Sequence, residues 1–229
     1  MKAVRILLGC ALVLALSATG RANIIINGDF SNGNDGSFVS NYTFVPNNVI
    51  NLSTGIYSVG TNATLVNNFW TAPSAVNNVV SNSPLPAGNY EFANGSGVPT
   101  SVWAQTVSLV NGATYTFSGY VATLFASNPA LLQITAGSQT LFAALPAPAT
   151  TGSWSGFQTT FIYTGATGNA VLNIQSNTTQ ALGNDFALDS LALNASAVPE
   201  PASVVLFGAG LAGFGLTAAR RYRRRRQAD

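Results

Sequence analysis

The sequence predicts an all-β domain, an antiparallel β-sandwich, for the region between two apolar terminal segments. Three observations support this prediction. Apolar and polar residues alternate with a period of two in several runs, and no helical 3.6-residue pattern lasts for about ten residues. Thr, Ser, Val, Tyr and Phe dominate these runs, as is typical of strands. Asn and Gly are concentrated between the runs, where turns are needed.

Residues 1–22 have the composition of an N-terminal signal peptide. Lys2 and Arg5 precede the apolar stretch 6–16, and small residues follow it up to Ala22. This order of a basic, an apolar and a small-residue region directs secretion. We therefore predict an N-terminal signal helix, cleavage before Asn23 and export of the residues that follow. Cleavage a few residues earlier stays open, because a basic residue lies next to this site.

The distribution of charge excludes several classes of function. The formal net charge is +2, but no Lys or Arg occurs between Ala22 and Ala219, and the chain has no His. The single cysteine, Cys10, lies in the predicted signal peptide. The exported part therefore lacks disulfides, thiol nucleophiles, Schiff-base lysines and His-based zinc sites. Its mildly acidic composition also argues against nucleic acid as a partner.

Two alternating runs predict the central strands. Residues 102–110 (VWAQTVSLV) lead through Asn111 and Gly112 into residues 113–124 (ATYTFSGYVATL). An Asn-Gly pair between two such runs is a strong short-range hairpin signal, because both turn positions need positive φ. The two runs are therefore predicted to pair as a β-hairpin.

Two further strands are expected before the C-terminal part of the domain. Aromatic residues alternate with polar ones over residues 157–163, and residues 170–176 (AVLNIQS) follow after a Gly-Asn turn. No linker or break in composition divides the exported region. Residues 23–197 are therefore predicted to form one domain, which is an ordinary size for a single domain.

The C-terminal segment predicts a membrane span. The apolar run Ala202 to Ala219 carries no charge, and as a helix with a rise of ~1.5 Å per residue it would extend roughly 27 Å. This length nearly matches a hydrocarbon core of ~30 Å. Prolines mark its entrance, and the arginine cluster that follows would stay in the cytoplasm under the positive-inside rule. We predict a single transmembrane helix at residues 202–219 with a short inner tail at 220–226.

The triplet Pro199-Glu200-Pro201, the apolar run and the arginine cluster follow one another in this C-terminal segment. In their order and spacing the segment resembles the PEP-CTERM sorting signal of Gram-negative bacteria. In that family a membrane-embedded transpeptidase, exosortase, recognises the tail and cleaves near the triplet. The resemblance implies an inner-membrane precursor and then a place at the cell surface or in the extracellular matrix, in a context of biofilm and exopolysaccharide. The residues that carry the predicted signal are Val198, Pro199, Glu200, Pro201, Arg220, Arg221, Arg223, Arg224, Arg225 and Arg226.

The two ends of the predicted domain carry a second resemblance. Residues 23–30 (NIIINGDF) and 183–193 (GNDFALDSLAL) resemble the first and last strands of galactose-binding-like jelly rolls, the fold of many carbohydrate-binding modules. Residues 102–121 resemble the central hairpin of that fold. The resemblance implies a jelly-roll-like sandwich whose first and last strands lie side by side. It indicates the fold more than the ligand, since one fold serves many functions.

Carbohydrate binding is the function that the residue types favour. Sugar rings stack on aromatic platforms, while amides and hydroxyls bind their hydroxyl groups. Trp103 lies within an alternating strand and is expected in the core, and Trp154 is expected to pack rather than to bind. Trp70, in the polar segment NNFWTAPSAV, is the predicted ligand-binding residue. The alternative function is a structural surface protein with no specific ligand. The aromatic candidates are Trp70, Trp103, Trp154, Tyr42, Tyr57 and Tyr90.

Catalysis is not expected, and no catalytic residue is predicted. Only a carboxylate pair remains available, as in glycosidases. Asp185 and Asp189 would share one strand face about 13 Å apart, at ~3.3 Å per residue. This separation exceeds the distances that retaining and inverting glycosidases use. A glycosidase is therefore the less favoured alternative.

Structural calcium is the one cofactor that the sequence suggests. In many galactose-binding-like sandwiches, carboxylates and backbone carbonyls of the first and last strands hold this ion. The corresponding segments here carry Asp29, Asp185 and Asp189, and no basic side chain of the domain could neutralise them. Calcium accepts about six to eight oxygen ligands in irregular geometry. These three aspartates are the predicted ligands, and the alternative is that they are solvated surface residues.

Overall fold

The computed structural model of the chain describes residues 23–73, 77–78, 83–84, 88–125, 127–180 and 182–196. The chain divides into two compact units, residues 1–195 and 196–229, and nearly all of the described residues belong to the first. The predicted signal helix and transmembrane helix lie outside the described residues. Within the part that is described, no helix is both long and apolar enough to cross a membrane.

The described residues form strands joined by turns and loops, with one short 3₁₀ helix, η1, at Ala63–Leu65. Most strands are long enough for the predicted alternation of side chains to be visible in their burial. The strands are β1 (Thr43–Phe44), β2 (Ile56–Gly60), β3 (Asn77–Asn78), β4 (Ser83–Pro84), β5 (Tyr90–Asn94), β6 (Thr100–Leu109), β7 (Thr114–Thr123), β8 (Leu131–Ala136), β9 (Gln139–Pro146), β10 (Trp154–Ile162), β11 (Gly168–Ser176) and β12 (Phe186–Ala195).

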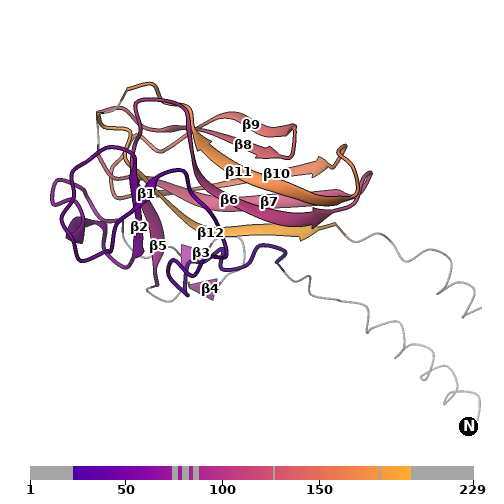
Figure 1. Cartoon of the computed structure of the whole chain (residues 1–229), viewed down its shortest axis with the longest axis horizontal. Coiled ribbons are helices and arrows are strands. Elements are labelled where there is room, and N and C mark those ends of the chain that lie inside the picture. The colour runs from indigo at the N-terminus through magenta and orange to yellow at the C-terminus, as the bar shows by residue number, and fades with distance from the viewer. Residues whose placement is uncertain are drawn as a thin grey trace, which may run out of the picture. The chain divides into compact units, whose positions relative to one another are not determined.

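Two sheets make up the architecture. In the described residues, the six-stranded sheet has the order β1-β2-β5-β12-β7-β10, and the four-stranded sheet has the order β6-β11-β8-β9. All neighbouring strands in the two sheets are antiparallel except the short β1, which pairs with β2 in parallel. The strands of both sheets are visible in Figure 1. The predicted all-β sandwich is therefore confirmed.

The predicted hairpin between β6 and β7 is wrong. Both strands occur where they were predicted, but β6 pairs with β11 in the four-stranded sheet and β7 pairs with β10 and β12 in the six-stranded sheet. The turn between them crosses from one sheet to the other. Its bond from the Ala113 N–H to the Val110 carbonyl is 3.1 Å long, and Gly112 has a φ of 77°. Positive φ at the third turn residue alone is typical of a type II turn, not of the hairpin turn I′.

The same kind of crossing follows β10. This strand ends at Ile162 in the six-stranded sheet, and β11 begins at Gly168 in the four-stranded sheet. Strands that are consecutive in the chain thus face each other across the core. Both a hairpin and a crossing have a side-chain period of two, so alternation alone does not distinguish them.

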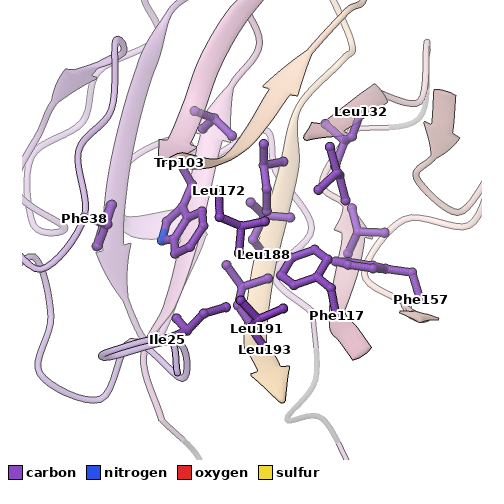
Figure 2. Close-up of a cluster of buried hydrophobic side chains, with 14 of the residues drawn as sticks. Ile25, Phe38, Trp103, Phe117, Leu132, Phe157, Leu172, Leu188, Leu191 and Leu193 are labelled. Atoms are coloured by element: carbon purple, nitrogen blue, oxygen red, sulfur yellow. The ribbon is translucent and has the colours of Figure 1, made fainter. Parts of the chain in front are cut away.

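The core lies between the two sheets and contains side chains from both. Trp103 of β6 and Leu172 of β11 meet Phe117 of β7 and Leu188 of β12, and all four are at most 1% exposed. Figure 2 shows these side chains converging between the strands. Full burial of such a side chain contributes about 1.5–3 kcal/mol relative to exposure. The expectation that Trp103 is a core residue is confirmed.

A second apolar cluster lies on the outer face of the six-stranded sheet. Phe92 of β5 and Ala187 of β12 contact Val66 and Trp70, which come from the loop residues that follow β2. The side chain of Trp154 packs against this cluster, as predicted, with its ring edge-to-face to that of Tyr90. The loop between β2 and β5 therefore covers this part of the sheet, and both faces of β5 are buried.

The first described residues lie against the last strand, as the resemblance implied. The Ile24 N–H donates to the Leu193 carbonyl at 2.9 Å, and the Leu191 N–H donates to the Gly28 carbonyl at 2.8 Å. A Cβ at Gly28 would lie 2.1 Å from the Leu191 carbonyl oxygen, so this approach requires glycine. Residues 23–30 form turns rather than the predicted strand.

An isolated carboxyl group, that of Glu91, is buried in this fold. Glu91 of β5 lies directly opposite Val59 of β2 and Leu188 of β12, so its side chain is on the core side of the sheet. The residue is 1% exposed, and neither carboxyl oxygen has a hydrogen-bond partner among the described residues. Burial raises the pKa of Glu91 well above its ordinary value of 4.5, because a buried charge loses its hydration. Burial therefore favours the protonated form of Glu91 in the folded protein.

The burial of Glu91 predicts that stability falls as pH rises above about 4.5. An unfolded Glu91 ionises near its ordinary pKa while the folded protein keeps the proton, so rising pH favours unfolding until the raised pKa is passed. For each pH unit between the pKa of the unfolded state and that of the folded state, the free energy of unfolding falls by about 1.4 kcal/mol. In urea unfolding monitored by tryptophan fluorescence, the free energy of unfolding should fall less for Glu91→Gln than for the wild type between about pH 4 and about pH 8. Asp35→Asn, at an exposed carboxyl, should keep the wild-type slope, and equal slopes for Glu91→Gln and the wild type would contradict the prediction.

Candidate binding site

A pocket of about 570 Å³ lies at one end of the sandwich, where three inter-strand connections meet. The connection from β7 to β8 contributes Asn128 and Pro129, and Leu131 follows at the start of β8. The other two connections come from the end of β9 and the end of β11. The remaining lining residues are Pro146, Ala147, Ala149, Asn177, Thr178, Thr179 and Gln180.

Backbone hydrogen bonds hold the three connections together. The Ala147 N–H donates to the Ala130 carbonyl at 2.8 Å, and the Asn177 N–H donates to the Leu131 carbonyl at 2.7 Å. The Thr178 hydroxyl accepts from the Leu131 N–H at 2.9 Å. The Asn128 amide donates to the Leu182 carbonyl at 2.9 Å. The walls of the pocket are therefore positioned by the ends of the strands rather than by one loop alone.

None of the described residues that line the pocket is charged or aromatic. Its polar groups are carboxamides and hydroxyls, and those of Thr179 and Gln180 are on exposed residues. Its apolar groups include the prolines and the side chain of Leu131, which is 43% exposed. This combination can bind the hydroxyl groups of a neutral polar ligand while contacting its C–H surfaces.

The structure corrects the prediction that Trp70 is an exposed platform. Trp70 is 4% exposed, and its ring lies in the second apolar cluster against Phe92. Its indole Nε1–H donates to the Asp185 Oδ2 atom at 2.7 Å. The exposed ring in this segment belongs to the preceding residue, Phe69, which is 66% exposed. The predicted segment thus presents a ring to solvent, but not the ring of Trp70.

Most of the other aromatic candidates are also inaccessible to a ligand. Tyr42, Tyr57, Tyr90 and Trp103 are all buried, and only Trp154 of that set is half-exposed. All three tyrosines make hydrogen bonds through their hydroxyl groups. Tyr42 accepts from the Ser96 N–H, Tyr90 accepts from the Ala63 N–H, and Tyr57 donates to the Asn34 Oδ1 atom. Their polar ends hold loops in place, so these aromatic residues stabilise the fold.

The three predicted calcium ligands do not come together. Asp185 precedes β12, and its carboxylate accepts hydrogen bonds from Trp70 and from the Gly95 N–H, the latter at 3.1 Å. Burial raises the pKa of Asp185, and these two bonds oppose the rise. In the described ranges, no three His, Cys, Asp or Glu side chains gather in a way that could hold a metal ion.

Asp29 and Asp189 do lie near each other, as predicted. Asp29 lines a second pocket, of about 350 Å³, between the first residues of the domain and the middle of β12. Burial raises the pKa of Asp189 to about 7, and the negative charge of Asp29 adds to this rise. The Asp189 Oδ1 atom accepts from the Ser190 N–H at 2.6 Å. The buried Ser190 hydroxyl lies beside this carboxylate and opposes the rise in the pKa of Asp189.

Sequence reasoning missed the pocket at the end of the sandwich. Residues 177–180 (NTTQ) are polar and follow a strand, which is also typical of a solvated loop. Residues 146–149 (PAPA) have no side chain that suggests binding. The pocket can be recognised only when the two segments and Asn128 are placed together, and this placement requires the sheet topology.

Comparison with known proteins identifies the C-terminal segment. Residues 197–226 match the family model described as the PEP-CTERM protein-sorting motif, which confirms the resemblance predicted from the tail. No curated protein sequence matches the chain.

Several solved structures are similar to the chain at low identity. The CBM22-1 xylan-binding domain of Paenibacillus barcinonensis Xyn10C is 16% identical, with a TM-score of 0.46, over 78% of this chain and 100% of that domain. TmCBM61, solved in complex with β-1,4-galactotriose, is 11% identical, with a TM-score of 0.46, over 76% and 99%.

The enzymatically active domain of bacteriophage CBA120 tailspike protein 4 is also similar. It is 11% identical, with a TM-score of 0.47, over 76% of this chain. The chain spans about a fifth (21%) of that tailspike domain. The comparisons thus identify a PEP-CTERM sorting motif at residues 197–226 of an exported, surface-sorted protein.

Proposed function

We propose that the β-sandwich binds a neutral polysaccharide and that the sorting motif delivers it to the cell surface or extracellular matrix. The observation that carries the binding proposal is the uncharged lining of the pocket at the end of the sandwich. A sugar residue offers hydroxyl groups on its rim and C–H groups on its faces. Carboxamides and hydroxyls can bind the rim, and proline and leucine side chains can contact the faces.

Binding is a better account of this pocket than catalysis. Glycoside hydrolysis requires two carboxyl groups on opposite sides of the scissile bond. The described lining residues of the pocket include no carboxyl group and no general base of the His or Lys type. We therefore propose a non-catalytic function in biofilm or exopolysaccharide. Without an aromatic platform the affinity of one pocket would be weak, and a repeating polymer would raise it through multivalency.

Removing the polar lining should weaken binding. We expect Thr179→Ala/Gln180→Ala in the full chain to weaken retention on a panel of neutral polysaccharides by about tenfold, since two hydrogen bonds contribute roughly 1–3 kcal/mol together. Affinity electrophoresis measures this retention. Thr106→Ala/Ser108→Ala, at exposed positions of β6, serves as the matched control and should bind as the wild type does.

Two results would contradict the proposed pocket. Loss of binding in Phe69→Ala with normal binding in Thr179→Ala/Gln180→Ala would place the ligand on the exposed Phe69 ring instead. Failure of the wild type to bind any member of the panel would favour the alternative, a structural surface protein with no specific ligand.

The sorting proposal concerns the precursor. We propose that the C-terminal helix holds the chain in the inner membrane until an exosortase-type enzyme cleaves near Pro199 to Ser203. Mass spectrometry of the mature protein from a host with this enzyme should find a C-terminus in that range. Glu200→Ala, or deletion of residues 220–226, should leave uncleaved precursor in the membrane. Deletion of residues 227–229, beyond the arginines, should leave cleavage intact, and a wild-type product that retains its arginines would refute the proposal.

Calcium binding is proposed only for Asp29 and Asp189, because the Asp185 carboxylate accepts a hydrogen bond from the buried Trp70. The two carboxylates repel each other, and a cation between them would relieve that repulsion. The buried Ser190 hydroxyl, which lies beside the Asp189 carboxylate, is a further oxygen at this position.

The calcium proposal predicts a shift in thermal stability. At a calcium concentration about a hundredfold above Kd, the free energy of unfolding should rise by about 2.7 kcal/mol relative to EDTA. Thermal melts of the full chain in millimolar calcium and in EDTA measure this difference. Asp185→Asn is the control and should keep the shift. An unchanged midpoint in the wild type, or a shift that survives Asp189→Ala, would eliminate the site.

A further inference from the structure

The edges of the two sheets differ between the two sides of the sandwich. On one side, the six-stranded sheet ends in β1, which has only two residues, and the free edge of β6 is covered by an upstream segment. Val39 and Ala104 exchange two backbone hydrogen bonds of 2.9 Å, and the Asn41 N–H donates to the Ser101 carbonyl. The Gln105 side chain also holds this segment, through bonds to Ile26 and Ser37.

On the other side, the sheets end in β9 and β10. The rings of Phe142 on β9 and Phe157 on β10 are in edge-to-face contact, so the two edge strands are adjacent. The Gln139 side chain of β9 occupies the far end of β10 by donating to the Ile162 carbonyl and accepting from the Thr164 N–H. For residues 155–161 of β10, the only strand pairing within the described residues is with β7.

The edge of β10 has none of the usual features that prevent edge-to-edge pairing. Such edges are normally shortened, bulged, or protected by proline or a charged side chain. β10 has nine residues in an unbroken register with β7, and it contains no proline and no charge. β9, by contrast, has two register irregularities with β8 and ends in a proline. β10 is therefore the unprotected edge.

The sequence of β10 favours pairing with another strand. Residues 157–162 (FQTTFI) are aromatic, β-branched or amide-bearing, and segments of this kind with low charge readily pair as strands. Ile162, at the end of the strand, is 58% exposed.

Charge does not keep two such edges apart. No Asp, Glu, Lys, Arg or His occurs from residue 92 to residue 184, which includes every strand from β6 to β11. Acids that are exposed in the described residues, Asp29 and Asp35, lie in the covering N-terminal segment. Two copies approaching through β10 would therefore meet no like-charge repulsion.

We propose that β10 pairs in antiparallel fashion with β10 of a second copy of this chain, joining the six-stranded sheets of the two copies. The occupant is a second copy because the uncharged edge is self-complementary: an antiparallel two-fold arrangement satisfies the same donors and acceptors on both strands. Centred on Thr159, this pairing places Phe157 opposite the partner's Phe161 on the core side. It places Gln158 opposite the partner's Thr160 on the outer side, and both kinds of pair stabilise sheets. The inference is independent of the ligand of the pocket.

Charge substitutions on β10 test this pairing. In the centred register, Gln158→Lys/Thr160→Lys places two pairs of lysines opposite each other. We expect this variant of the full chain, purified in detergent, to self-associate at least about tenfold more weakly than the wild type in sedimentation velocity. Val171→Lys, at an exposed position of the central strand β11, is the control and should associate as the wild type does. Thermal melts verify that both variants are folded.

A complementary pair distinguishes edge pairing from other causes of association. Gln158→Glu/Thr160→Glu alone should also associate more weakly than the wild type. Mixing it with Gln158→Lys/Thr160→Lys should restore association as a mixed dimer. Restoration excludes association through the membrane segment, which the substitutions do not touch. A monomeric wild type, undiminished association of the lysine variant, or no recovery on mixing would each overturn the proposal.

Discussion

The feature on which the rest of this structure depends is the absence of any basic side chain between residues 22 and 219. A buried carboxyl group in this domain has no cation as a partner, so each acid depends on neutral donors or keeps its proton. Asp185 accepts from Trp70 and Gly95, and this arrangement ties the loop before β12 to the outer apolar cluster. Glu91 has no donor among the described residues, and its burial raises its pKa and so favours the protonated form. The titration of these buried groups, rather than ion pairing, therefore governs how the fold responds to pH.

The second constraint is the repeated crossing of the chain between the sheets. Because β6 leads to β7, and β10 to β11, across the core, side chains from neighbouring parts of the sequence pack face to face. The crossings also decide which connections share an end of the sandwich. The connections after β7, β9 and β11 meet around one pocket, although they are far apart in the sequence. The same topology leaves β9 and β10 as adjacent edges on one side.

These features are consistent with a protein that works at high local density outside the cell. The proposed delivery to a surface would bring many copies together, and there the proposed contacts between copies and with a polymer would gain strength through multivalency. An uncharged surface of amides, hydroxyls and small apolar groups suits such contacts, since it neither repels a second copy nor depends on ionic strength. The pocket is formed by connections at one end of the sandwich, whereas the proposed pairing uses the edge of β10. The two kinds of contact can therefore occur together.

The sequence by itself determined the all-β class, the positions of the long strands, the burial of Trp103 and the sorting motif, because each is encoded in local periodicity or in a contiguous motif. It did not determine that β6 and β7 belong to different sheets, since a hairpin and a crossing have the same alternation. It predicted an exposed ring near residue 70 but not that Phe69, rather than Trp70, faces solvent. It also did not indicate that Glu91 is buried, because that burial depends on the second strand layer across the core. Local pattern fixes the period of a strand, whereas its neighbours and the loops that converge beside it are decided by contacts between residues distant in the chain.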